Sequence, residues 1–281
     1  MEGGSLELGI WDLPHDCISH IFSLTSPRDV CRCSAVSSVF RSAAESDAVW
    51  ERFLPPNWEE IISKSVSPVE EFSSLRAVYF HLCDSPILVD GQGKKNFALV
   101  KENGKIYYMV APEDLSMRLV CVPTVWEGIF PMPYAYECDK SVISRFSEVY
   151  DVDDGSSSWL QIHGRIQMQF LSPNTTYAAY LVYVPRRAIV FNHWPVLKVA
   201  IKFVSNGGEE NKIEVVSNEG VYRGCDRIDK WMEVEVGEFF NGGQDDVEVE
   251  VEMRLWEIRE YGFVCPSGLD LQGIEIRPKE K

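Results

Sequence analysis

The feature that most restricts the fold is a strict alternation of apolar and polar side chains in the second half of the chain. Residues 247–255 carry an apolar side chain at every second position, with acids and Arg254 between them. Residues 160–170 alternate in the same way. A period of two is typical of a β-strand with one buried and one wet face. The acids of residues 247–255 can meet basic partners on neighbouring strands of that wet face.

Further strand patterns recur without helical patterns between them. They are separated by turn sequences such as GQG, ENGK and SNGGEE, and cover residues 87–90, 97–101, 106–111, 177–184, 196–204, 213–216, 230–236 and 273–277. Many short strands without intervening helices favour an antiparallel β-sandwich.

Residues 10–54 have helical spacing instead. Pro14 with Asp16 begins one short helix, and Ser26-Pro27-Arg28-Asp29 begins another, with Ser26 as N-cap and Pro27 at the first helical position. A longer helix is predicted from Ser67-Pro68, because apolar residues recur on one face: Phe72, Leu75, Tyr79 and Leu82. The fold class is therefore α+β, a small helical block followed by the sandwich.

This helical block is too small to bury all its apolar side chains. Each large apolar side chain left in water forgoes about 1.5–3 kcal/mol, and so few residues make a poor core. Either helices of a partner protein or the chain's own β domain must supply the cover. An aromatic such as Trp50 is the type of residue that anchors an interface.

Composition excludes several classes of protein. Apolar residues make up 45% and charged residues 25%, as in a folded globular protein. The net charge of −16 disfavours nucleic-acid and membrane partners. The eight cysteines form no CxxC pair, so reduced thiols are expected, with no metal and no cofactor. No secretory signal or membrane span is evident, and the expected location is the cytoplasm, the nucleus or both.

Residues 13–55, LPHDCISHIFSLTSPRDVCRCSAVSSVFRSAAESDAVWERFLP, resemble an F-box. The Leu-Pro opening, the Ser-Pro-x-Asp restart and the closing Trp50 carry the resemblance. It implies a Skp-type adaptor as partner and, through it, a cullin-based ubiquitin ligase. The residues expected to contact the adaptor are Leu13, Pro14, Ile18, Ile21, Phe22, Pro27, Val30, Val36, Phe40 and Trp50.

The rest of the chain resembles the phloem protein 2 family of plants, the Nictaba-like lectins, in its F-box-bearing branch. Four segments carry the resemblance: YFHLCDSPILVDGQGKKNFAL, WLQIHGRIQMQFLSPNTTYAAYLVY, DKWMEVEVGEFF and LQGIEIRPK. It implies a β-sandwich and, in lectin members, a site for N-acetylglucosamine-type glycans.

A sugar site needs an exposed aromatic ring beside polar groups. Trp126 with Glu127 is the best candidate pair, and His163, on the polar side of its strand, is a further one. Leu119 and Gly128 stand where this family often has aromatic residues, which removes two rings from such a site.

The sequence shows no motif of an enzyme: GxSxG, HExxH and a phosphate-cradling glycine loop are all missing. The expected organisation is an F-box over residues 10–54, a helical connector over 55–85 and a sandwich over 86–281. The expected function is that of a non-catalytic substrate receptor of a Skp–cullin–F-box ligase, whose client is a protein or glycoprotein. The alternative is a nucleocytoplasmic lectin for N-acetylglucosamine-type glycans with no ubiquitin role.

Overall fold

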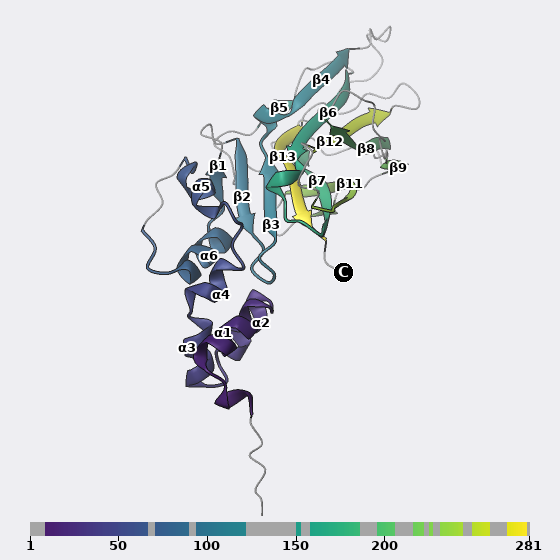
Figure 1. The fold of residues 1–281 in the computed structure, drawn as a ribbon. Coiled ribbons are helices and arrows are strands. Elements are labelled where there is room, and N and C mark those ends of the chain that lie inside the picture. Colours follow the sequence, from purple (N-terminus) through teal and green to yellow (C-terminus); the bar gives the residue numbers. More distant parts are fainter. Residues whose placement is uncertain are drawn as a thin grey trace, which may run out of the picture. The chain divides into compact units, whose positions relative to one another are not determined.

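Figure 1 shows the fold of the chain as a computed structural model. It describes residues 9–66, 71–89, 94–121, 150–152, 158–185, 196–205, 216–221, 225–226, 231–243, 249–258 and 269–279. The chain divides into two compact units. The first comprises Met1–Gly91 with Phe97–Ile106, and the second comprises Gln92–Asn96 with Tyr107–Lys281. Strand β2 (Lys95–Leu99) therefore begins in the second unit and ends in the first.

Short helices make up most of the first unit. They are η1 (Ile10–Asp12, a 3₁₀ helix), α1 (His15–Ser23), α2 (Pro27–Cys33), α3 (Ser38–Ala44), α4 (Asp47–Glu51), α5 (Trp58–Ser63) and α6 (Leu75–Asp84), followed by strand β1 (Ile87–Val89). Serine hydroxyls cap three of them, because Ser26, Ser37 and Ser74 each accept a hydrogen bond from the backbone N–H three residues later. The predicted start of α2, with Ser26 as cap and Pro27 at its first position, is confirmed.

The predicted start of the longer helix is wrong. Residues 71–74 are not helical, and α6 begins at Leu75 because the side chain of Ser74 caps it. Residues 67–70 lie outside the described residues. The expected inward face is present from there on, since Val78, Tyr79 and Leu82 are buried.

The second unit consists of two antiparallel sheets. Its strands are β3 (Ile106–Val110), β4 (Ser116–Cys121), β5 (Tyr150–Val152), β6 (Ser158–Gln167), β7 (Thr175–Pro185), β8 (Val196–Ser205), β9 (Val216–Val221), β10 (Cys225–Asp226), β11 (Met232–Asn241), β12 (Val249–Ile258) and β13 (Leu269–Pro278), with 3₁₀ helices η2 (Pro112–Asp114) and η3 (Met168–Phe170). One sheet contains the order β3-β13-β7-β11-β10, with β5 also paired to β13, and the other has the order β4-β6-β12-β8-β9. The expected layout of helices followed by antiparallel sheets is confirmed.

Side chains from both sheets fill the space between them. Phe203 of β8 lies 6.4 Å from Phe239 of β11, measured between ring centroids. At Gly164 of β6 there is no room for a side chain, because a Cβ atom would come within 2.9 Å of Ile274 in β13 and of Leu115. The alternation predicted over residues 160–170 ends early, since β6 stops at Gln167 and η3 follows it, which leaves Phe170 exposed.

Candidate functional site

Helix α1 carries two apolar stripes. Ile18 and Phe22, together with Ser19, are buried within the first unit. Cys17, Ile21 and Leu24 follow at positions i, i+4 and i+7 on another side of the helix, and all three are exposed. Ile21 is 37% and Leu24 is 67% exposed, so this second stripe is not covered by the helix's own unit.

Other apolar side chains are exposed before α1, in the α2–α3 turn and in α3. Ile10 and Leu13 precede the helix, while Val36 and Val39 lie in the α2–α3 turn and in α3, at 60% and 45% exposure. Helix α1 packs on α3, and a 3.3 Å contact between the His15 Nε2 and the Ser42 hydroxyl links them. We call this set the apolar surface; it consists of Ile10, Leu13, Ile21, Leu24, Val36 and Val39. Exposed apolar side chains on helices that pack together are candidates for an interaction site.

The ten residues expected to contact an adaptor separate into two groups. Four are exposed: Leu13, Pro14, Ile21 and Val36. Six are buried in the core of the first unit: Ile18, Phe22, Pro27, Val30, Phe40 and Trp50. Sequence reasoning did not single out Ile10, Leu24 and Val39 as exposed. The helical spacing of Cys17, Ile21 and Leu24 is the signal that could have identified Leu24 as part of an exposed stripe.

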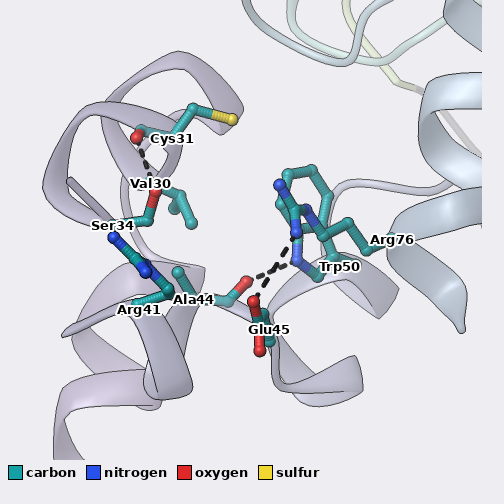
Figure 2. A pocket seen from close by; sticks show the side chains of 8 residues that line it. All are labelled: Val30, Cys31, Ser34, Arg41, Ala44, Glu45, Trp50 and Arg76. Atoms are coloured by element: carbon teal, nitrogen blue, oxygen red, sulfur yellow. Dashed lines mark hydrogen bonds and ion pairs between the residues drawn. The ribbon is translucent and has the colours of Figure 1, made fainter. Parts of the chain in front are cut away.

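Trp50 faces its own chain. Its indole ring lies 5.1 Å from Tyr79 and 5.3 Å from Phe80 of α6, and 5.8 Å from Phe53. Its N–H donates to the Ala44 carbonyl oxygen at 2.7 Å (Figure 2). The side chain is only 1% exposed. Trp50 therefore joins the F-box-like helices to α6 of the same unit, a cover that differs from both expected ones, a partner protein and the β domain.

The turn at residues 100–105 completes this core. The Tyr79 hydroxyl donates to the carbonyl oxygens of Val100 and Lys101, at 3.3 and 3.2 Å. Gly104 has φ +69°, and a Cβ there would lie 3.0 Å from the Phe53 carbonyl oxygen, so the close approach requires glycine. Burial raises the pKa of the Tyr79 phenol, and burial also raises the pKa of the Cys83 thiol to about 11. Both groups are therefore neutral at physiological pH.

In the second unit a buried carboxylate lies on the side of β12 that was expected to be wet. The Glu252 side chain is 4% exposed and receives hydrogen bonds from Arg254 at 2.7 Å and Arg165 of β6 at 3.4 Å. Burial would raise the pKa of Glu252, but these two guanidinium groups outweigh it and hold the pKa below its ordinary value. The predicted basic partner on a neighbouring strand is confirmed, since Arg165 lies on β6. The prediction that Glu252 faces solvent is wrong, because its side chain is buried between Arg254 and Arg165.

The other sheet carries a second charged network. Arg277 of β13 makes two hydrogen bonds to the Glu233 carboxylate of β11, at 3.0 and 2.6 Å, across β7. Its guanidinium carbon lies 3.8 Å from the centre of the Tyr180 ring of β7. Burial and the neighbouring Glu235 raise the pKa of Tyr180, against the lowering effect of Arg277. Arg277 thus links β13 to β11 over the face of the Tyr180 ring of β7.

The predicted glycan residues are only partly described. Trp126, Glu127 and Gly128 lie outside the described residues. Leu119 is paired with Leu160 at the β4–β6 contact. His163 is half-buried on β6, opposite Ser116 of β4 and Arg254 of β12.

Among the residues whose placement is described, no group of three or more His, Cys, Asp or Glu side chains could hold a metal ion. Within the same part of the chain, the helices are too short or too polar to cross a membrane.

Comparisons with known proteins agree with this architecture. Residues 10–55 match the family described as F-box-like, and residues 105–278 match the family Phloem protein 2. F-box protein PP2-B10 of Arabidopsis thaliana is 37% identical, over 94% of this chain and 92% of its own. F-box protein PP2-B15 of the same plant is 38% identical, over 95% of this chain and 96% of its own.

Solved structures are much less similar. A cyclase from Fischerella sp. TAU is 13% identical, with a TM-score of 0.28 over 62% of this chain and 90% of its own. A likeness this weak says nothing about what the chain binds. The two family matches and the Arabidopsis relatives confirm both resemblances found in the sequence. The chain therefore belongs to the F-box proteins that carry a phloem protein 2, lectin-like, domain.

Proposed function

We propose that this protein is the substrate-recognition subunit of a Skp–cullin–F-box ubiquitin ligase. The helices of residues 10–54 bind a Skp-type adaptor, residues 55–85 connect them to the β domain, and residues 86–281 receive the client. The apolar surface is the observation that carries the proposal, because its side chains stay exposed after the first unit has formed its own core. The family of the chain agrees with it.

The two groups of F-box residues have different roles in this proposal. Leu13, Pro14, Ile21 and Val36 touch the adaptor, and Leu24 and Val39 extend the contact. Ile18, Phe22, Pro27, Val30, Phe40 and Trp50 hold the exposed residues in place from beneath. Catalysis then comes from proximity, because tethering raises the effective concentration of client lysines near the ubiquitin-charged enzyme, without chemistry in this chain. Such a complex works in the cytoplasm, the nucleus or both.

Binding to a purified Skp-type adaptor tests the proposal. The variant Ile21→Glu with Leu24→Glu places two charges on the exposed stripe of α1 and should weaken binding by roughly 100-fold or more, as expected for two central interface residues. Val66→Glu is the matched control, because Val66 is 51% exposed and lies in the same unit outside residues 10–54. It should bind like the wild type.

Equal binding by the double variant and the wild type would remove the proposal. Variants of Ile18 or Trp50 are unsuitable here, since both side chains are buried and their loss tests folding rather than contact. Urea unfolding of each variant verifies that its fold is intact.

The second candidate is a lectin that binds N-acetylglucosamine-type glycans, and the match of residues 105–278 to the phloem protein 2 family favours it. Trp126 would stack on the sugar, with Glu127 and His163 as polar contacts. A glycan array with the full chain and with Trp126→Ala tests this. Binding that depends on Trp126 supports the lectin, whereas no binding favours a protein client.

A further inference from the structure

A polar pocket lies where α2, α3, α4 and α6 meet, inside the first unit. Its volume is about 100 Å³, well below the roughly 300–1,000 Å³ of sites for drug-sized ligands. Figure 2 shows the side chains that line it: Val30, Cys31, Ser34, Arg41, Ala44, Glu45, Trp50 and Arg76. The size suits one small polar group.

Two guanidinium groups supply most of the donors in this pocket. Arg41 is exposed, and its side chain makes no hydrogen bond or ion pair with any residue that the structure describes. Arg76 lies over the rings of Trp50 and Phe80, at 5.9 and 5.7 Å, and its ion pair with Glu45 is long, at 3.9 Å. A guanidinium whose flat face stacks on a ring keeps its in-plane N–H groups for another acceptor. The guanidinium groups of Arg41 and Arg76 beside the single carboxylate of Glu45 leave the pocket cationic, in a chain of net charge −16.

The arrangement of these donors selects the shape of the anion. Figure 2 shows Arg41 of α3 on the Ser34 side of the pocket and Arg76 of α6 over Trp50 on the other side. A carboxylate presents both of its oxygens in one direction, whereas a tetrahedral oxyanion presents oxygens in several. The Trp50 N–H does not compete for the ligand, because the Ala44 carbonyl oxygen already accepts it.

Glu45 distinguishes between tetrahedral oxyanions. Its carboxylate can only accept a hydrogen bond when ionised. Hydrogen phosphate carries a proton near neutral pH and can donate it, whereas sulfate carries none and would meet only repulsion. Phosphate monoesters lose their last proton at about pH 6, so they also lack the donor.

We propose that this pocket binds inorganic hydrogen phosphate between Arg41 and Arg76, with Glu45 accepting the phosphate proton. This site is separate from the apolar surface, and it requires neither an adaptor nor a client.

Calorimetric titration of the full chain with sodium phosphate, sodium sulfate and phenyl phosphate, at matched ionic strength and about pH 7.5, tests the proposal. Phosphate should bind saturably, and sulfate and phenyl phosphate should each bind at least about tenfold more weakly. Arg41→Gln should weaken phosphate binding at least about tenfold, because the substitution removes a charge-assisted hydrogen bond to the anion. Arg52→Gln is the matched control: Arg52 is an exposed arginine at the end of α4, outside the pocket, and its loss should change nothing.

Glu45→Gln supplies the decisive arm. An amide can donate to sulfate, so the preference for phosphate over sulfate should disappear. The proposal is overturned if the wild type shows no saturable phosphate binding, if Arg41→Gln binds phosphate like the wild type, or if Glu45→Gln keeps the preference. The unfolding midpoint of each variant without phosphate verifies that its fold is intact.

Discussion

The indole ring of Trp50, in the last helix of the F-box segment, lies 5.1 Å from the phenol ring of Tyr79 in α6. Trp50→Ala removes this contact and leaves the Ala44 carbonyl oxygen without its donor. We expect the free energy of unfolding of the first unit to fall by about 3–5 kcal/mol. Urea unfolding followed by the helical circular dichroism signal measures it. Val39→Ala, at an exposed site, should change it by less than about 0.5 kcal/mol. A Trp50→Ala protein as stable as the Val39→Ala control would contradict the packing described.

The same packing predicts how fragments behave. A peptide of residues 9–54 lacks Tyr79, Phe80 and the turn that covers them, so it should show no cooperative thermal transition. A fragment of residues 9–106 contains these elements and should melt cooperatively. Circular dichroism melting of both fragments makes the comparison. Cooperative melting of the shorter peptide at the temperature of the longer one would show that α6 is dispensable.

Glu252 predicts a pH-dependent loss of stability. Its pKa is lowered in the folded state, so its ionised form stabilises the fold above the unfolded pKa of about 4.3, and this contribution is lost as the pH falls through the folded pKa. Arg254→Met removes the 2.7 Å hydrogen bond, and Arg165 alone then opposes the effect of burial on the pKa of Glu252. We expect Arg254→Met to lower the free energy of unfolding by about 2 kcal/mol at neutral pH, and this difference from the wild type should shrink below about pH 4.

Unfolding free energies at several pH values measure this difference. Arg165→Met is the control, since Arg165 is 58% exposed and its hydrogen bond to Glu252 is longer, at 3.4 Å. This variant should lower the free energy of unfolding by less than Arg254→Met does. A difference between Arg254→Met and the wild type that does not vary with pH would rule out Glu252 as its source.

Gly273 occupies a position that only glycine can take. It has φ +138° at the β-bulge of β13, and a Cβ there would lie 2.1 Å from the Val110 carbonyl oxygen. Gly273→Ala should therefore destabilise the second unit by more than about 3 kcal/mol. At Gly242 the nearest atom to a new Cβ is 3.6 Å away, so Gly242→Ala should be nearly neutral. Thermal unfolding of both variants tests whether the bulge requires glycine. Equal melting temperatures for Gly273→Ala and Gly242→Ala would contradict this requirement.

Local signals in the sequence were enough to find most of the elements. Ser26 and Pro27 mark the start of α2 because a hydroxyl cap and a fixed φ act within one turn of helix. Alternation located β6 and β12, since it reflects one buried face. The short strands β5 and β10 were not predicted, because two or three residues show no period. Strand β4 was not predicted either, and β9 overlaps the predicted segment 213–216 only at Val216.

The site was harder to predict, because burial depends on contacts that are distant in the chain. Ile18 and Ile21 have the same chemistry and lie one turn apart on α1, yet one is buried and the other is exposed. Only the packing of α1 against α3 and α4 separates them. Trp50 is buried by α6, whose residues lie about 30 positions later. The pocket near Arg41 likewise needs four helices in place.

The first unit is discontinuous in sequence, since it takes residues 97–106 from beyond β1. A chimera that grafts only the first 54 residues onto another recognition domain would leave Trp50 without its covering rings. Gene fusions that exchange client specificity should therefore be joined after residue 106, so that the grafted segment contains every residue of the core of the first unit.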